Sequence, residues 1–169
     1  MSYILSAQRD DDPLRYFERY TAYIESQRDR FPPSALALLD SDWYLGFSDH
    51  RAPHDAWLED VRVIETRRYD DDSRPETTIH TRLLGAYHDG IIEFSYTGVT
   101  SYSLQMADLT RGHCDWRYDE FRVSESGDLI HEIEWCGMGD TGRWLIQARD
   151  VTHSWHPFDT ATSEAHTPT

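Results

Sequence analysis

The sequence predicts an α+β domain, with N-terminal helices packed on an antiparallel meander sheet of about six or seven strands. Three observations predict this class. Apolar residues repeat at helical spacing only near the N-terminus, and runs of alternating apolar and polar residues follow. Short turn signals, such as Asp89-Gly90, join successive runs. Because the runs follow one another without helices between them, they are expected to pair as antiparallel hairpins.

The helices are expected before residue 40. Asp12-Pro13 is typical of a helix start, because Asp caps the first free amides and Pro fits the first turn. Apolar side chains then recur near one side of the helix, which predicts a helix over residues 13–30. Pro32-Pro33 ends this helix, and residues 35–39 are expected to form a short helical turn.

The first strand is expected at 57–67, before the loop signal Asp70-Asp71-Asp72. Asp89-Gly90 then predicts a hairpin with a two-residue type I′ turn, since both central residues of that turn need positive φ. Such a turn pairs Leu83 with Tyr96 and collects the apolar side chains of both strands on one face. A short strand from Thr100 to Leu104 is expected to follow this hairpin.

A second hairpin is expected, with strands near 116–124 and 128–136. A three-residue loop, Glu125-Ser126-Gly127, puts the apolar side chains of both strands on one face. A two-residue loop would mix the two faces, because a slip of one residue exchanges them. A last strand is expected at 143–150, where apolar and polar residues alternate.

The length of 169 residues fits one domain. The polar segment 156–169 is expected to be a flexible tail, which leaves residues 1–155 as a single α+β domain. Only 38% of the residues are hydrophobic, but 13% are aromatic. Each aromatic side chain buries about 150–250 Å², so the core is expected to be aromatic.

The charge balance excludes two classes of partner. All 16 basic residues are Arg, and 31 acidic residues give a net charge of −15. Binding to nucleic acid needs a basic surface, and anionic membranes make the same demand, so neither partner is expected. An acidic surface instead suits a basic protein partner, whose approach it accelerates.

The cysteines and the N-terminus indicate a cytoplasmic protein. Cys114 and Cys136 are too few for a disulfide scaffold in a chain of this size, so both are expected to be reduced. The N-terminal sequence has neither the charged nor the apolar region of a signal peptide, and no apolar stretch is long enough to cross a membrane.

The second hairpin supplies the candidate interface. Its register puts Glu120, Glu132 and Glu134 together on the outer face, with Arg122 among them. These four residues are predicted to form a protein-binding acidic patch. The alternatives are a solvated sheet face with an Arg–Glu pair, and a pair of carboxylates that act as acid and base.

Other motifs favour no cofactor, metal or catalytic site. The glycine pattern of residues 137–142 matches a dinucleotide fingerprint, but a strand is expected after it where that fingerprint needs a helix. His50 and His54 are separated by a proline, and no histidine spacing resembles that of a zinc site. His113, if it lies on a strand, points away from its neighbour Cys114 and cannot activate it.

One region resembles a known family. Its segments are Tyr118-Asp119-Glu120-Phe121-Arg122, then residues 127–135, then Arg143-Trp144-Leu145-Ile146. This C-terminal hairpin region resembles small acidic bacterial proteins of the immunity type, which are encoded beside secreted toxins. The resemblance implies a cytoplasmic protein that binds and blocks a toxin, and it assigns no individual binding residues.

Together, these observations predict a non-enzymatic acidic binding protein. The best specific hypothesis is an immunity protein that neutralises a basic toxin. The alternative is a small-molecule-binding protein or an enzyme with a pocket on the antiparallel sheet, which a deep apolar pocket with converging polar groups would indicate.

Overall fold

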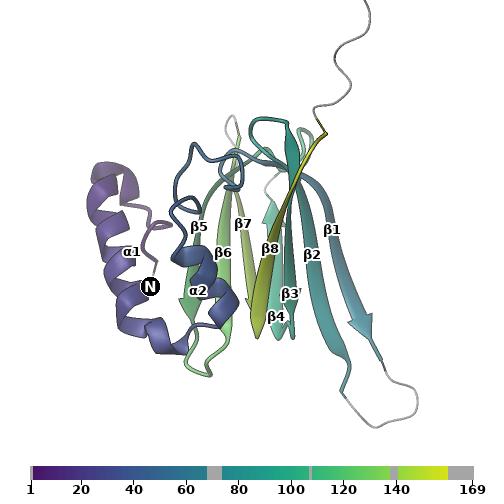
Figure 1. Ribbon diagram of the computed structural model, residues 1–169, viewed down its shortest axis with the longest axis horizontal. Coiled ribbons are helices and arrows are strands. Elements are labelled where there is room, and N and C mark those ends of the chain that lie inside the picture. The colour runs from purple at the N-terminus through teal and green to yellow at the C-terminus, as the bar shows by residue number, and fades with distance from the viewer. Residues whose placement is uncertain (1, 68–73, 107, 138–140, 160–169) are drawn as a thin grey trace, which may run out of the picture.

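The computed structural model describes residues 2–67, 74–106, 108–137 and 141–159. Two α-helices precede an antiparallel sheet of eight strands (Figure 1). The predicted α+β class is therefore confirmed, whereas the expected number of six or seven strands is wrong. The helices and strands are α1 (Pro13–Gln27), α2 (Pro33–Leu39), β1 (Trp57–Thr66), β2 (Glu76–Leu84), β3 (Gly90–Thr97), β4 (Ser101–Met106), β5 (Asp115–Val123), β6 (Leu129–Cys136), β7 (Thr141–Ala148) and β8 (Asp150–Pro157).

The additional strand is β8: the last predicted strand ended at 150 and the predicted tail began at 156, so residues 151–155 were expected in no strand. β8 pairs with β3 along its whole length, from Thr97↔Asp150 to Gly90↔Pro157. Its inward-facing residues after Val151 are His153 and Trp155, which lie opposite Phe94 and Ile92. Because these two side chains are not aliphatic, the alternation is hard to detect. Most of the predicted tail, residues 160–169, lies outside the described residues, as does the predicted loop at 70–72.

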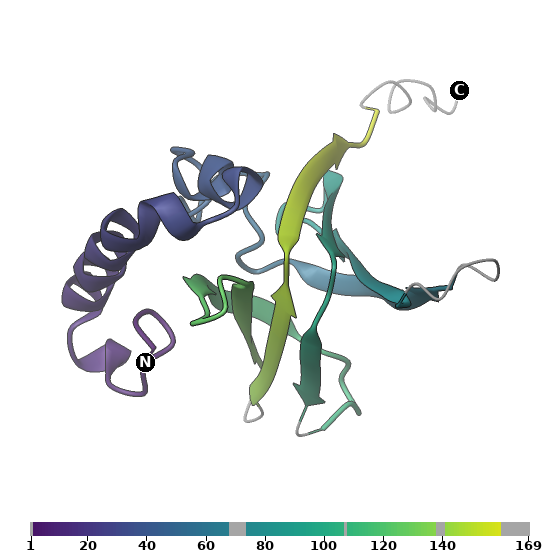
Figure 2. The ribbon, with the colours of Figure 1, turned by 90° about the horizontal axis from the view of Figure 1, so that it is seen from below.

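The sheet is divided into two halves that face each other. In the strand order β4-β7-β6-β5-β1-β2-β3-β8, β5 and β1 meet only at Trp57↔Asp115. The two halves then diverge, as the view from below shows (Figure 2). Short connections, at residues 98–100 and at Arg149, carry the chain from one half to the other. The inner faces of both halves can therefore bury a common core.

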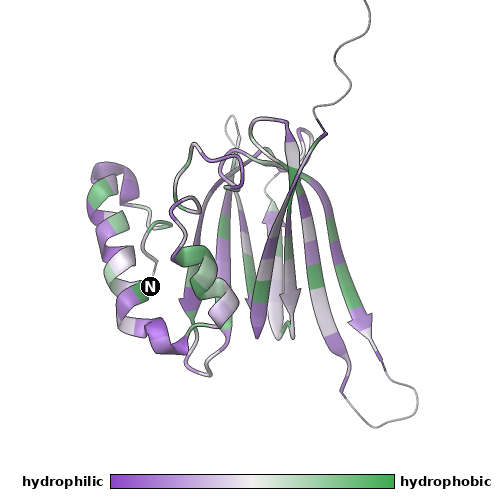
Figure 3. Cartoon of the chain, viewed as in Figure 1, coloured by the Kyte–Doolittle hydropathy of each residue, from purple (hydrophilic) through white to green (hydrophobic). Residues whose placement is uncertain are grey.

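The core is aromatic, as the composition predicted. Hydrophobic and hydrophilic residues alternate along the strands (Figure 3), and the inward set is buried. Rings from opposite halves are in contact, with the ring centroids of Phe94 and Trp116 5.4 Å apart. The largest fully buried side chains are Trp116, Trp135, Trp144, Tyr20, Tyr96, Phe94 and Phe121.

The helices lie on one side of the sheet, and α1 replaces a missing neighbour of β5. The predicted helix at 13–30 is confirmed as α1 followed by a 3₁₀ turn, and Asp12 caps it by accepting from the Arg15 amide at 3.3 Å. The Tyr20 hydroxyl accepts from the Phe121 amide at 2.6 Å and donates to the Phe121 carbonyl at 3.0 Å. The Tyr23 hydroxyl accepts from the Val123 amide at 2.9 Å. These two tyrosines satisfy strand groups that would otherwise be left unpaired.

The first hairpin forms with a different turn from the one predicted. Leu83 pairs with Ile92 and not with Tyr96, because residues 85–89 form a longer loop. His88, and not Asp89 or Gly90, has a positive φ of 56°. The register differs from the predicted one by four residues, an even number, so the apolar face is unchanged. Gly90 is instead required by close packing, since a Cβ there would lie 2.3 Å from the Trp155 ring.

The second hairpin has the predicted loop and register. The amide of Ser124 donates to the carbonyl of Asp128, which leaves residues 125–127 as the three-residue loop. Gly127 has a φ of 91°, which favours glycine. Phe121 pairs with His131, and both are fully buried on the inner face.

Candidate functional site

The predicted interface residues lie together on the outer face of β5 and β6. Glu120 pairs with Glu132, as expected, and Arg122 lies between their carboxylates, with Nε 3.1 Å from Oε1 of Glu120. Arg122 also forms an ion pair with Glu132. Two further arginines complete what we call the Arg–Glu cluster. Its members are Arg9, Glu120, Arg122, Glu132, Glu134 and Arg143.

The Arg–Glu cluster holds the N-terminal segment on the sheet. The amides of Tyr3 and Leu5 donate to Oε2 of Glu120 at 2.9 and 3.3 Å. Arg9 donates to the carbonyl of Ile4 and lies 3.1 Å from Oε1 of Glu134. Glu120 is fully buried under this segment, and burial raises the pKa of its carboxyl group.

Three guanidinium groups thus face the three carboxylates of the cluster, so the patch carries little net charge. That Glu120, Arg122, Glu132 and Glu134 contact a partner stays a prediction. In the structure their partners are one another, Arg143 and the N-terminal segment. The sequence analysis missed this cover, because nothing local links Tyr3 or Arg9 to a strand more than a hundred residues away.

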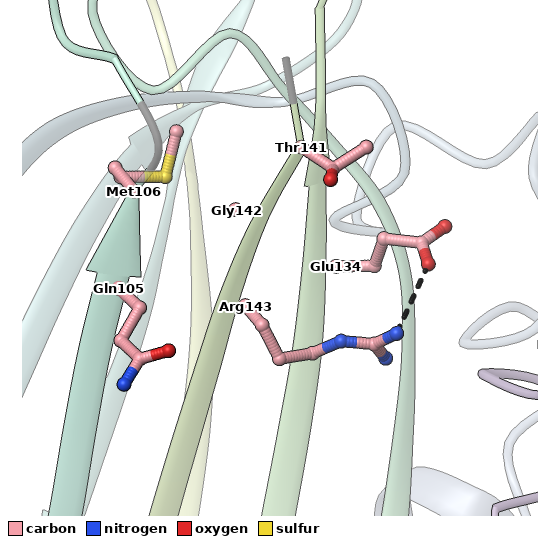
Figure 4. Close-up of a pocket in the computed structure, with 6 residues that line it drawn as sticks. All are labelled: Gln105, Met106, Glu134, Thr141, Gly142 and Arg143. Carbon is pink, nitrogen blue, oxygen red and sulfur yellow. Dashed lines mark hydrogen bonds and ion pairs between the residues drawn. The ribbon is translucent and has the colours of Figure 1, made fainter.

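A surface hollow of about 290 Å³ adjoins the cluster (Figure 4). Glu134 and Arg143 contribute its charged groups, and the Arg143 guanidinium points toward Glu134, with Nη2 3.4 Å from Oε2. The charges of Glu134 and Arg143 compensate each other. Gly142 lies at its floor, where a Cβ would be 2.0 Å from the Met106 sulfur.

A buried polar network lies in the core and was not predicted. Its centre is Asp119, which accepts from the Tyr44 hydroxyl at 2.6 Å, from Nε1 of Trp116 at 3.0 Å and from Nε2 of His131 at 2.9 Å. The Tyr96 hydroxyl lies 2.8 Å from Nδ1 of His131. Burial raises the pKa of Tyr44 and Tyr96 well above 10, so both hydroxyls keep their protons and can donate.

This Asp–His pair resembles a catalytic pair only in its residue types. His131 is fully buried, and the free space beside Asp119 is about 10 Å³. That volume holds about one water molecule. A substrate cannot reach the pair, so the network is structural: it satisfies polar groups in the core and fixes the inner faces of the sheet relative to α2 and its following loop.

A third group of residues lies at one end of the sheet. The registers place the starts of β1, β3, β5 and β7 and the ends of β2, β4, β6 and β8 at the same edge, which is the upper edge in Figure 1. Large hydrophobic side chains are exposed there, on the loops and at the start of β1. We call them the loop-end surface: Trp57 (48% exposed), Tyr87 (50%), Leu109 (59%) and Phe158 (49%).

Two aromatic members of the loop-end surface, Trp57 and Tyr87, are held in place by contacts of their side chains. Nε1 of Trp57 donates to Oδ1 of Asp115 at 2.7 Å, and its ring lies 4.5 Å from that of His88. The Tyr87 ring stacks on His50 at 4.0 Å, and its hydroxyl donates to the Ser48 carbonyl at 3.1 Å. These contacts fix two large rings in water-accessible positions. A sequence cannot indicate this, because every aromatic residue also has a plausible place in the core.

A hollow of about 420 Å³ adjoins Trp57, and we call it the Trp57 hollow. Its lining includes His113 and Cys114, which lie in the connection before β5, with a φ of 59° at Cys114. Its lining residues are Trp57, Leu58, Arg111, Gly112, His113, Cys114, Asp115 and Gly137.

The remaining candidate motifs form no shared site. His50 contacts Asp89, whereas His54 bonds to the Arg117 carbonyl. Within the described ranges, no three His, Cys, Asp or Glu side chains gather closely enough to hold a metal ion. The glycine pattern at 137–142 lies partly outside the described residues, but Cys136 pairs with Thr141 across an antiparallel hairpin, as expected.

Comparison with known proteins adds no assignment. The chain matches no protein-family model, no curated protein and no solved structure. Among the residues that the structure describes, no helix has the length and apolar character needed to cross a bilayer.

The environment of His153 is expected to make the stability of the protein depend on pH. Burial lowers the pKa of His153 to about 4, and Nε2 lies 3.1 Å from the Arg51 carbonyl. An unfolded histidine titrates near 6.5, so between about pH 6.5 and 4 the unfolded state binds more protons. The free energy of unfolding is therefore expected to fall as the pH drops through this window, by up to about 1.4 kcal/mol per pH unit from this group.

Denaturant titrations of the wild type and of His153→Phe across this window measure the effect. The phenylalanine keeps the ring beside Trp43 and Phe94 but cannot titrate. The dependence on pH is expected to be shallower in this variant and unchanged in the control His156→Phe, whose side chain is 57% exposed. Equal slopes in all three proteins would contradict the prediction.

Proposed function

We propose that this protein binds a basic protein partner through the loop-end surface and does not catalyse a reaction. The observation that carries the proposal is the group of half-exposed Trp57, Tyr87 and Phe158 at one end of an acidic domain. Exposed apolar groups of this kind mark interaction sites, and Trp and Tyr are enriched among the residues that dominate binding energy.

The fixed positions of these rings favour binding further. Ordering a side chain on association costs about 0.5–1.5 kcal/mol. Trp57 and Tyr87 are already held by hydrogen bonds and by ring contacts with His88 and His50. A partner that covers them therefore gains the apolar contact with little additional ordering.

The charge of the domain indicates the nature of the partner. A net charge of −15 attracts a basic protein over long distances and repels an acidic one. At about 0.15 M ionic strength the screening length is about 8 Å, so added salt should slow association much more than it speeds dissociation. A secreted bacterial toxin is the specific candidate, because of the resemblance to immunity-type proteins.

One observation favours a second candidate function, the binding of a small molecule. The Trp57 hollow, at about 420 Å³, falls within the usual range of about 300–1,000 Å³ for ligand sites. It combines an aromatic ring with polar groups from Arg111 and Asp115. Under this alternative, metabolite binding and not protein binding would depend on Trp57.

The test starts with capture of partners from the source cell by the tagged wild-type protein. A captured basic protein is then measured by association kinetics against Trp57→Ala/Tyr87→Ala. We expect this variant to bind at least about 10-fold more weakly, because it removes both fixed rings. The control Tyr102→Ala removes a tyrosine that is 48% exposed on β4, away from the loop end, and should bind normally.

The same measurement compares the two candidate surfaces. Glu132→Gln/Glu134→Gln removes charge from the Arg–Glu cluster and leaves the loop-end surface intact. If this variant loses binding while Trp57→Ala/Tyr87→Ala keeps it, the partner contacts the outer sheet face and our assignment of the surface is wrong. Capture of an acidic protein only would overturn the proposed class of partner.

A further inference from the structure

The Trp57 hollow has the walls of a site for one long side chain. Trp57 and Leu58 come from the start of β1, residues 111–114 approach them from the connection before β5, and Asp115 is the first residue of β5. Its volume of about 420 Å³ exceeds that of any single side chain. The hollow therefore has room for a side chain of a bound partner without rearrangement of the sheet.

The Trp57 ring is presented in a defined orientation. Its Nε1 donates to Asp115 at 2.7 Å, and its ring contacts His88 at 4.5 Å with an interplanar angle of 58°. Asp115 pairs with both Trp57 and Cys136 in the sheet, so the carboxylate is also held by the fold. An indole face and a carboxylate are thus fixed beside each other in a partly apolar hollow.

This pair of groups selects a cation with a long apolar stem. Trp is the best aromatic partner for a cation, because its ring face carries the most negative potential of the aromatic side chains. An arginine stacks its planar guanidinium on the ring, hydrogen-bonds to a carboxylate and packs its methylene groups on apolar walls.

The lining contains two further basic groups, His113 and Arg111. Burial lowers the pKa of His113, which keeps it neutral at pH 7. Arg111 lies in the lining and has an interaction of its own. The charged group that is hydrogen-bonded to the indole is the carboxylate of Asp115.

We propose that the Trp57 hollow binds an arginine side chain of the basic partner, with its guanidinium over the Trp57 ring and beside Asp115. This inference rests on the proposed function, and it names the chemical group of the partner that the loop-end surface recognises.

The test uses N-acetyl-L-arginine methylamide as the probe and the full chain labelled with ¹⁵N. The six tryptophans give six indole N–H signals, and Trp57→Phe assigns the signal of Trp57. We expect the probe to shift the Trp57 signal along a saturable curve. The neutral isostere N-acetyl-L-citrulline methylamide should shift it at least about 5-fold less, because the cation–π and ionic contributions are lost.

Two variants show whether the carboxylate takes part. Asp115→Asn keeps an oxygen that can accept from Trp57 but removes the charge, and it should weaken arginine binding at least about 5-fold. Asp128→Asn makes the same change of net charge at the opposite end of the sheet and should bind the probe as the wild type does. An equal effect of both variants, an equal shift with citrulline, or equal shifts of all six indole signals would overturn the inference.

The two proposals fail separately. If Trp57→Ala/Tyr87→Ala abolishes binding of the captured partner while the arginine probe does not bind, the loop-end surface is the interface and the arginine inference is wrong. If the probe binds as expected and the same variant keeps full affinity for the partner, the proposed function is wrong and the hollow serves a free cationic ligand.

Discussion

Asp119→Ala is expected to lower the free energy of unfolding by about 3–5 kcal/mol, because breaking a buried ionic and hydrogen-bonded group leaves its partners unsatisfied. The substitution removes the acceptor of Tyr44, Trp116 and His131 together. His131 and Trp116 are fully buried, so water cannot replace the carboxylate without opening the core.

Chemical denaturation of Asp119→Ala and of Asp42→Ala measures this effect. Asp42 is exposed, so the same chemical change there should alter stability by no more than about 0.5 kcal/mol. A loss below about 1 kcal/mol in Asp119→Ala would show that the network contributes little and that the surrounding core relaxes around the missing group.

Trp135→Ala is expected to destabilise the protein by about 3–5 kcal/mol, through the lost burial and the cavity left behind. The Trp135 ring is fully buried between two others, with ring centroids 5.4 Å from Trp116 and 5.0 Å from Trp144. In a core with few aliphatic side chains, these large rings occupy the space between the two halves of the sheet.

Trp57→Ala is the matched control, since it deletes the same side chain from a position that is 48% exposed. In denaturant titrations, Trp57→Ala should lower the free energy of unfolding by about 1 kcal/mol or less. Its affinity for the partner should fall. Equal losses of stability in the two variants would contradict the assignment of Trp135 to the core and Trp57 to the surface.

The sequence of a hairpin specifies which side chains share a face more strictly than it specifies which residues pair. Parity specified the second hairpin, because a one-residue slip would have put Phe121 and His131 on opposite faces of the sheet. The same argument leaves slips of two or four residues undecided. The first hairpin was therefore predicted with the correct faces and the wrong pairing, in which Leu83 was matched with Tyr96 and not with Ile92.

The alternation of side chains between the two faces of a strand could also have predicted the buried network. If Glu120 lies on the outer face, Asp119 lies on the inner face near His131, and a carboxylate there must have donors. The two tyrosines of the network could not be predicted, since Tyr44, which donates to Asp119, and Tyr96, which contacts His131, come from distant parts of the chain. For the same reason the burial of Glu120 could not be predicted. The acidic pattern lies in one stretch of sequence, but Tyr3, Leu5 and Arg9, which belong to the segment that buries Glu120, are distant in the chain.

Because α1 is hydrogen-bonded to β5, the hydrogen exchange of two strand amides reports whether this helix is docked. In most sheets, slow amide hydrogen exchange within a strand reports on separation from the neighbouring strand. Here the amides of Phe121 and Val123 donate to the hydroxyls of Tyr20 and Tyr23. The exchange rates of these two amides therefore report the undocking of α1, even while β5 stays paired with β6. If α1 detaches only when the whole protein unfolds, the two amides will exchange as slowly as the amides of the core.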